Sequence, residues 1–109
     1  MGKPVAGEVD VISFPRTDVT RVMGRPALVI EDLPGPDLIL CQITSRAHSD
    51  AYSVPLDTSD CERGELNQPC FIRPQRLFTL EHHLILHSIG KVQAAKLDEV
   101  LRKVREFFN

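Results

Sequence analysis

The chain has 109 residues, of which 42% are hydrophobic, and it contains no tryptophan. This length suits one domain with a modest core, to which an oligomer interface would add burial. The net charge of −2 excludes a protein that binds nucleic acid through charge spread over its whole surface, so a polyanion site has to be a local patch. The first ten residues have no apolar run and no stretch approaches the length of a membrane span, so we expect a cytoplasmic protein without membrane contact.

The spacing of cysteines and histidines predicts no metal site, and we expect no cofactor. The cysteines are odd in number and include no C-x-x-C pair, which argues against a disulfide framework or a zinc site. They are Cys41, Cys61 and Cys70. Two histidines within residues 82–87 are four residues apart, a spacing that binds metal on a helix, but the surrounding LILHSIGKV is typical of a strand.

The predicted elements begin with a short leader, residues 1–6, ahead of one domain over residues 7–109. Residues 7–14 (GEVDVISF) alternate between apolar and polar side chains, which predicts a strand that Pro15 ends. Residues 16–24 are polar and lack a clear period, so we expect a long loop there.

A second and a third strand follow. Residues 26–32 (PALVIED) include a continuous apolar run, and predict a short strand in which Pro26 is tolerated only as the first residue. Proline and glycine within residues 33–37 mark a turn. Residues 38–44 (LILCQIT) then predict a long, mostly buried strand.

The middle of the chain is polar, with a weak strand signal near residues 52–56. Residues 70–73 (CFIR) predict a short strand, and residues 74–83 (PQRLFTLEHH) a turn or a short helical piece. Residues 84–92 predict a last strand with a bend or bulge at Gly90.

Only the C-terminal segment, residues 96–108, has a helical pattern, with apolar side chains on one face and charged side chains on the other. The apolar positions are Leu97, Val100, Leu101, Val104 and Phe108. Several short strands followed by one amphipathic helix predict a mainly β fold, a small barrel that the helix covers.

Every basic residue between positions 16 and 76 is arginine, whose planar fork suits phosphate, although a coding bias would give the same pattern. Arg25 stands between Gly24 and Pro26, so its backbone is held extended where it leaves the predicted loop. It is either a phosphate-binding residue or an arginine that lies along the rim of the barrel.

A second group of candidates follows the strand predicted over residues 38–44. Thr44 and Ser45 carry hydroxyl groups that can hydrogen-bond a phosphate or a 2′-hydroxyl, or cap the following turn. Arg46 and His48 add hydrogen-bond donors nearby.

Arg73 also precedes a proline, and Arg76 follows three residues later. Two arginines mounted in this way, Arg25 and Arg73, could converge on one anion.

The order and spacing of several segments resemble those of the MazF/PemK toxins of type II toxin–antitoxin systems. The similar segments are GEVDVISFP, RPALVI, ITS, the stretch from GEL through FIRPQRLFTL, IGKV and the terminal helix. Together they cover residues 7 to about 108.

The resemblance implies an SH3-like (PemK/CcdB-type) barrel that works as a homodimer. It implies a sequence-specific, metal-independent endoribonuclease that cleaves single-stranded mRNA to a 2′,3′-cyclic phosphate, inhibits translation and growth, and is blocked by an acidic antitoxin. On this resemblance the catalytic residues are Arg25, Thr44 and Arg73. The residues expected to bind the substrate are Arg16, Arg21, Ser45, Arg46, His48, Gln75 and Arg76.

Gln75 departs from the family pattern, because some members have an aspartate at this position that acts with the arginine. Glutamine cannot act as a general base, so the base stays unassigned. Two other functions stay open. A CcdB-like toxin binds DNA gyrase without catalysis, and a catalytically degenerate member would bind only its antitoxin, for which Gln75 is the best argument.

Overall fold

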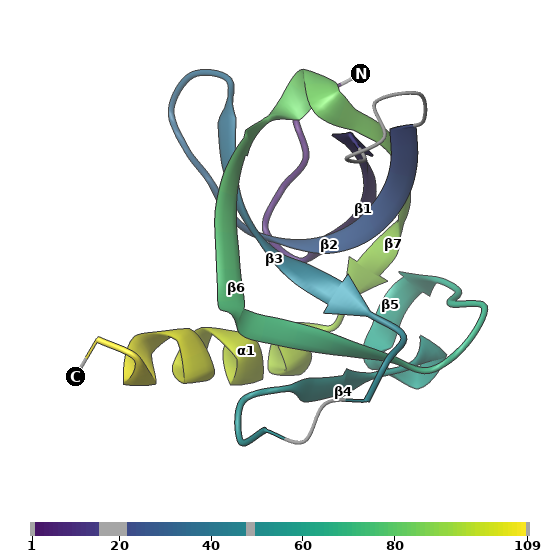
Figure 1. Cartoon of the computed structure of the whole chain (residues 1–109), viewed down its shortest axis with the longest axis vertical. Coiled ribbons are helices and arrows are strands. Elements are labelled where there is room, and N and C mark those ends of the chain that lie inside the picture. The colour runs from purple at the N-terminus through teal and green to yellow at the C-terminus, as the bar shows by residue number, and fades with distance from the viewer. Residues whose placement is uncertain (1, 16–21, 48–49, 109) are drawn as a thin grey trace.

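The computed structural model shows a strongly curled sheet of seven strands with one α-helix packed against it (Figure 1). It describes residues 2–15, 22–47 and 50–108. The strand order is β4-β6-β3-β2-β1-β7-β5, and the neighbouring strands of this described part are antiparallel. The sheet forms a half-barrel, which confirms the predicted mainly β fold with a C-terminal helix.

The strands are β1 Glu8–Pro15, β2 Val22–Asp32, β3 Asp37–Thr44, β4 Val54–Leu56, β5 Cys61–Gly64, β6 Cys70–Glu81 and β7 Ile85–Val92. The helices are the 3-10 turns η1 Thr58–Asp60 and η2 His82–Leu84, and α1 Ala94–Glu106. The predicted first, third and last strands are confirmed, and α1 begins two residues earlier than predicted. In the described part of the chain, no helix is long and apolar enough to cross a membrane.

The prediction for the start of β2 is wrong. The strand begins at Val22, so Pro26 lies within it, opposite Val11 of β1. Pairing of β2 with β3 begins only at Ala27, opposite Gln42. At Pro26 the strand is therefore paired with β1 only. Because no β3 residue pairs with it, the missing proline N–H costs no ladder hydrogen bond on that side.

The prediction for residues 70–83 is also wrong, because β6 continues through Pro74 to Glu81. On β3, the adjacent residues Cys41 and Gln42 pair with Leu77 and Arg73, so residues 74–76 bulge out of the ladder. Proline has no N–H to give to the ladder, which explains why the sheet is interrupted there. The strand then resumes, so Pro74 bends it without ending it.

The strand β5 was not predicted, because its sequence CERG is polar and short. It pairs with β7 at Gly64 and Gly90. A Cβ on Gly64 would lie 2.2 Å from the Ile89 carbonyl oxygen, so only glycine permits this approach. The predicted bulge near Gly90 is confirmed, since the partner of β1 changes there from Gly90 to Ser88.

Alternation along the central strands produces two apolar clusters on opposite faces of the sheet. One cluster lies under α1 and β4, and its buried members include Leu28, Cys41, Ile43, Ile72 and Val100. The other consists of Ile12, Ala27, Val29, Leu38 and Leu40. The helix contributes its predicted apolar face except for Phe108, which is 77% exposed.

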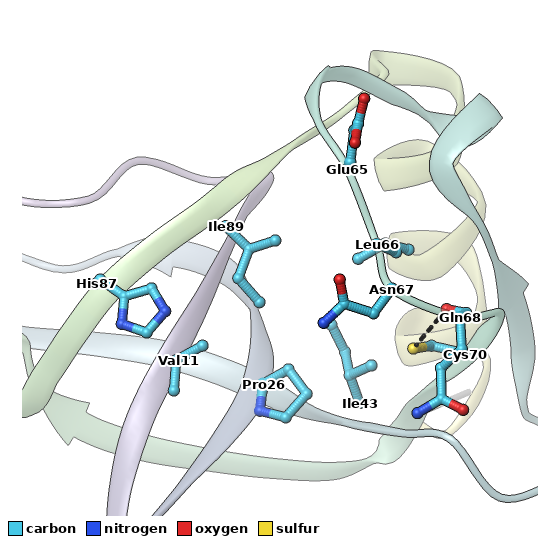
Figure 2. A pocket seen from close by; sticks show the side chains of 10 residues that line it. All are labelled: Val11, Pro26, Ile43, Glu65, Leu66, Asn67, Gln68, Cys70, His87 and Ile89. Atoms are coloured by element: carbon cyan, nitrogen blue, oxygen red, sulfur yellow. Dashed lines mark hydrogen bonds between the residues drawn. The ribbon is translucent and has the colours of Figure 1, made fainter.

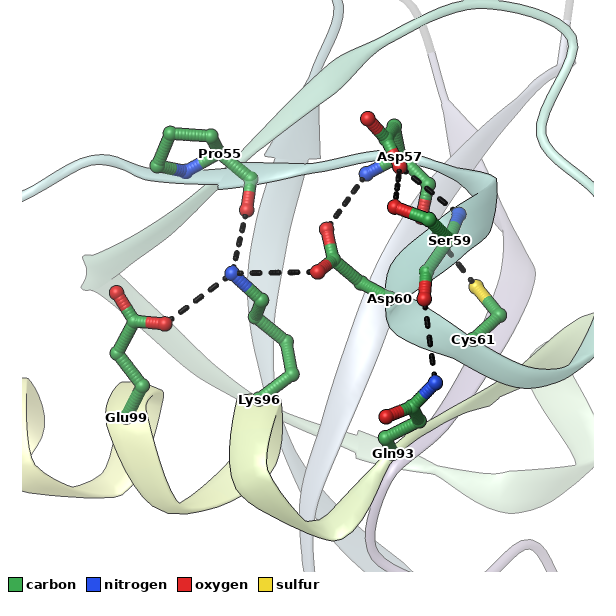
Figure 3. Close-up of polar contacts among 8 residues, drawn as sticks. All are labelled: Pro55, Asp57, Ser59, Asp60, Cys61, Gln93, Lys96 and Glu99. Carbon is green, nitrogen blue, oxygen red and sulfur yellow. Dashed lines mark hydrogen bonds and ion pairs between the residues drawn. The ribbon is translucent and has the colours of Figure 1, made fainter.

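Polar contacts fix the start of α1 to the segment after β4 (Figure 3). The Lys96 ammonium donates to the Pro55 carbonyl at 3.0 Å and forms ion pairs with Glu99 at 3.1 Å and Asp60 at 3.7 Å. Asp57 caps η1 by accepting from the backbone N–H of Ser59. We call Lys96 and these partners the helix anchor. In the helix anchor, Lys96 therefore has three partners, namely one carbonyl and two carboxylates.

Candidate active site

The strand register brings Arg25 and Thr44 to the same place on the sheet. The pairing of β2 with β3 includes Ala27 opposite Gln42. Arg25 is two residues before Ala27 in β2, and Thr44 is two residues after Gln42 in β3, so both lie beyond the same pair. Side chains two residues apart in a strand project to the same face, so Arg25 and Thr44 lie on the face of Ala27 and Gln42. Two residues that are 19 positions apart in the sequence thus form one candidate pair.

Arg73 lies on the next strand of the same face. It pairs with Gln42, whose other neighbour is Ala27, so these three residues form a row across β2, β3 and β6. Arg25 and Thr44 belong to the adjacent row, two residues along the strands, and side chains two residues apart in a strand share a face. The three predicted catalytic residues therefore lie on one face of the sheet.

Arg25 lies within β2, opposite Ile12 of β1, and is exposed. Among the described residues, no carboxylate lies within ion-pair distance of its guanidinium. Ser45 and Arg46 are also exposed just beyond Thr44. An anion that approaches this end of β2 and β3 therefore meets two exposed arginines.

The Thr44 hydroxyl caps the turn after β3. Its Oγ1 accepts from the backbone N–H of Arg46 at 3.2 Å, as the cap alternative predicts. A hydroxyl that accepts in this way still has its own hydrogen to donate. The cap fixes the orientation of Thr44 without using that hydrogen.

Arg73 pairs with a carboxylate that the sequence analysis did not single out. Its Nη2 lies 3.7 Å from Oδ2 of Asp50, and the two side chains are 14% and 21% exposed. Hydrogen bonds from the backbone N–H groups of Ser53 and Tyr52, together with the Arg73 charge, lower the pKa of Asp50. Asp50 is therefore ionised at neutral pH and is a weak base.

The bulge in β6 opens a cavity of about 310 Å³ beside Arg73. Its lining residues are Gln42, Arg76, Leu77 and Phe78. Three side-chain atoms around the bulge are buried without a hydrogen-bond partner in the described part of the chain, namely Gln42 Oε1, Gln75 Oε1 and Arg73 Nε. Buried polar atoms are normally paired, so three around one bulge require an explanation.

Asp10 is a further buried polar residue of this face. It pairs with Ala27, fully buried, and neither of its oxygens has a hydrogen-bond partner among the described residues. Burial, followed by repulsion from the Glu8 carboxylate, raises the pKa of Asp10 to about 7. Because its carboxyl group is enclosed, we attribute to Asp10 an effect on stability and not on substrate.

The opposite face of the same strand ends holds an apolar cavity of about 360 Å³ (Figure 2). Val11, Pro26 and Ile43 point into it, and the segment of residues 65–70 covers it. Its lining residues, within the described part of the chain, include no lysine or arginine. This cavity is poorly suited to a phosphate, which leaves the Arg25 face as the candidate site.

Three predicted substrate-binding residues, Arg16, Arg21 and His48, lie outside the described residues. Gln75 and Arg76 lie in and beside the bulge. The described residues contain no group of three His, Cys, Asp or Glu side chains that could hold a metal ion.

Two residues of this face, Gln42 and Asp50, were missed from the sequence. Gln42 is the one polar residue inside the apolar run LILCQI, which is the signal that could have revealed it. Asp50 ends the polar stretch SRAHSD, where nothing distinguishes it from a solvated loop residue. Only the fold brings Asp50 to Arg73.

The fold of the chain is a small half-barrel with a C-terminal helix. Comparison of its sequence with protein families identifies the family within this fold class. Residues 6–108 match the family model of PemK-like, MazF-like toxins of type II toxin–antitoxin systems. The chain belongs to this family. Among curated proteins, none matches it.

Solved structures with the same fold include MazE–MazF from Deinococcus radiodurans, with a TM-score of 0.77, 19% identity, and coverage of 98% of this chain and 97% of that chain. Toxin MazF-mt6 from Mycobacterium tuberculosis has a TM-score of 0.72 at 18% identity, covering 93% and 95%. An endoribonuclease in complex with its cognate antitoxin, from a Mycobacterial species, has a TM-score of 0.75 at 15% identity, covering 96% and 94%. At these identities the likeness shows the fold.

Proposed function

We propose that this toxin is a sequence-specific endoribonuclease that cleaves single-stranded mRNA without a metal ion. The observation that supports the proposal is the strand pairing, from which we infer that Arg25, Thr44 and Arg73 share one face of neighbouring strands. Family membership supports a toxin, and one protein of the same fold is an endoribonuclease bound to its antitoxin.

The proposed reaction is a transesterification within the RNA. The 2′-hydroxyl oxygen forms a bond to the adjacent phosphorus as its proton departs, and the bond from phosphorus to the 5′-oxygen breaks. The 5′-oxygen takes up a proton, which leaves a 5′-hydroxyl on one product and a 2′,3′-cyclic phosphate on the other. Since the nucleophile belongs to the substrate, the protein has to orient the RNA and stabilise the developing charge.

Arg25 is suited to the phosphate that reacts, because it is exposed and its backbone is held in β2. Its forked donors would bind the phosphoryl oxygens as their charge increases. Thr44 would donate its free hydroxyl hydrogen to the same phosphate or to the 2′-hydroxyl. Arg73 would bind a phosphate in place of Asp50, whose ion pair at 3.7 Å is long and easily exchanged.

Neither Asp50 nor Asp10 is well suited to remove the 2′-hydroxyl proton. Asp50 has a lowered pKa, Asp10 is buried, and Gln75 stands where some members of the family have an aspartate. We therefore assign the larger part of the rate enhancement to positioning and to electrostatic stabilisation by the arginines.

The same exposed arginines suit a second anionic partner, an acidic antitoxin segment that would compete with RNA. The partner arrangement that we propose is a cytoplasmic homodimer of the toxin neutralised by such an antitoxin. Structures of this fold include complexes with an antitoxin, which supports the antitoxin as a partner.

The test is incubation of the purified chain with a long RNA in the presence of EDTA, followed by mapping of the cut ends. We expect cuts at a defined sequence with cyclic-phosphate ends. Arg25→Ala should lower the cleavage rate by about 100-fold to 1,000-fold, the usual loss on removing one charge-stabilising donor. Thr44→Ala should lower it less.

The matched control is Arg102→Ala, which removes an exposed arginine on α1 and should leave cleavage unchanged. Cleavage that requires magnesium, or that survives Arg25→Ala, would contradict the proposal.

A further inference from the structure

We propose that Asp50 is an autoinhibitory residue, whose carboxylate pairs with Arg73 in the free chain in the place of an RNA phosphate and so limits how tightly the substrate binds. The inference rests on the proposed function, in which Arg73 binds a phosphate, and adds a residue that sets the affinity. Loss of the Asp50 charge then strengthens RNA binding, whereas loss of a residue that positions Arg73 would weaken it.

The Asp50–Arg73 pair lies where a ligand can compete for it. Oδ2 of Asp50 is 3.7 Å from Nη2 of Arg73, and both side chains are partly exposed. A short charge-assisted hydrogen bond would bring the two atoms to about 2.8 Å, so the observed pair is a weak contact. A guanidinium binds phosphate through a planar fork of donors, which makes a phosphate the better ligand for Arg73.

The carboxylate is fixed by its own turn, so it does not move away when a ligand arrives. Oδ1 of Asp50 accepts from the backbone N–H groups of Tyr52 and Ser53, both at 2.8 Å, and Oδ2 accepts from Ser53 Oγ at 3.2 Å. The hydrogen bonds from Ser53 and Tyr52 lower the pKa of Asp50, which keeps the carboxylate charged at neutral pH. A phosphate therefore has to take Arg73 from a carboxylate that stays charged and in place.

Contacts with α1 hold the turn itself. The Tyr52 ring packs edge-on against Phe107, with 5.1 Å between the ring centroids, and Lys103 Nζ donates to the Ala51 carbonyl at 3.2 Å. Aromatic pairs in this geometry are stabilising beyond the area that they bury. The turn is thus held by the end of the helix, while its carboxylate contacts Arg73.

The expected effect on RNA binding follows from competition. An ion pair that has to be broken before the substrate binds lowers the apparent affinity, because only molecules with a free Arg73 can take up the phosphate. The loss is the same for the bound substrate and for the transition state, so the affinity changes and the maximal rate does not. Ion pairs between partly exposed side chains are weak, and we expect about a two-fold to five-fold effect on the dissociation constant.

The experiment measures binding and cleavage separately. Binding is measured by fluorescence anisotropy with a labelled RNA that contains the mapped cut sequence and is 2′-O-methylated, so that it lacks the nucleophile. Cleavage is measured by single-turnover kinetics with saturating unmodified RNA. The test variant is Asp50→Asn, because asparagine Oδ1 still accepts from Tyr52 and Ser53 while the charge is lost. We expect tighter binding and the wild-type maximal rate.

The matched control is Asp57→Asn. Asp57 likewise accepts from a backbone N–H and a hydroxyl, both of Ser59, and its pKa is also lowered, but the cation near it is Lys96 of the helix anchor. The control makes the same change in net charge and should leave the RNA affinity nearly unchanged. Thermal unfolding verifies that both variants are folded.

The effect of Asp50 has to pass through Arg73. In an Arg73→Ala background, Asp50→Asn should therefore give no further gain in RNA affinity. An equal gain in that background overturns the inference. So does a folded Asp50→Asn that binds RNA no more tightly than the wild type or cleaves it more slowly. In each case the nuclease function stands if the wild-type chain cleaves RNA.

If the wild-type chain cleaves no RNA, the proposed function is wrong and binding alone decides, with a 2′-O-methylated RNA of random sequence. A gain in affinity in Asp50→Asn that requires Arg73 supports the inference. Equal affinity of the two proteins, or no binding by either, overturns it.

Discussion

The helix anchor around Lys96 and the face that carries Gln42 and Arg73 use polar side chains in opposite ways. In the anchor, the Lys96 ammonium contacts a carbonyl and two carboxylates, and Asp57 caps the turn beside it. On the other face, Gln42, Arg73 and Asp10 each have at least one buried polar atom without a partner in the described part of the chain.

The difference separates polar side chains that stabilise the fold from polar side chains that are available to bind a ligand. A polar group that is satisfied within the chain stabilises one conformation, and little is left for a ligand to gain from it. A buried group without a partner costs stability until something pairs with it. Three predictions use this contrast, beginning with the largest expected effect.

Asp10→Asn tests whether the buried carboxyl group of Asp10 lowers the stability of the fold. The pKa of Asp10 is about 7 in the folded chain, against an ordinary value of 3.8, chiefly because of burial. Between these values the folded state binds more protons than the unfolded state, so the free energy of unfolding falls as pH rises. Asparagine removes this dependence. We expect the variant to be more stable than the wild type at pH 8 by on the order of a few kcal/mol.

The measurement is urea unfolding of both proteins at pH 5 and pH 8. The advantage of Asp10→Asn should shrink towards the lower pH, and comparison with the wild type cancels the effects of other carboxylates. Asp98→Asn, an exposed substitution on α1, is the control. A stability difference that does not change with pH would show that the Asp10 carboxyl is not the source.

Arg73→Ala tests whether an arginine whose Nε has no partner in the described part of the chain, and whose one ion pair is long, serves a ligand. We expect the rate of RNA cleavage to fall about 100-fold, because one charged donor to a phosphate is lost. The fold should be little affected, since Asp50 keeps its hydrogen bonds from Ser53 and Tyr52. Single-turnover cleavage and thermal unfolding measure the two effects. A variant that loses stability in proportion to activity would place Arg73 with the structural groups.

Lys96→Met makes the converse test on the helix anchor. It keeps the length of the side chain but leaves the Pro55 carbonyl without its donor. We expect a loss of about 1–2 kcal/mol in the free energy of unfolding, and unchanged RNA cleavage. Arg102→Met, on the exposed side of α1, should cost less than about 0.5 kcal/mol. If Lys96→Met stays stable but loses RNA cleavage, the helix anchor does not serve the fold alone, and the proposed difference between the two regions is wrong.

Much of the fold was predictable where one local pattern dominates. The alternation in GEVDVISF, the apolar run LILCQIT and the helical spacing after Lys96 each correspond to an observed element. Both errors in strand boundaries occurred at prolines. Pro26 and Pro74 lie within strands, because the sheet offers one an unpaired side and the other a bulge. Neighbouring strands decide this, and they are distant in sequence.

The residues of the candidate site likewise include some that were predictable from the sequence and some that were not. Arg25, Thr44 and Arg73 were selected from the sequence by their residue types, their neighbours and a family resemblance. Gln42 and Asp50 were not, because one is a single polar residue in an apolar run and the other a loop carboxylate.

The sequence by itself determined a mainly β chain with a terminal helix, and it supplied the arginines and the threonine. The tertiary structure alone decided that they share a face, that Asp50 pairs with Arg73, and that a bulge leaves a cavity over Gln42. The physical reason is that local propensities act over a few residues, whereas strand register and the pairing of buried polar atoms depend on segments brought together only by folding.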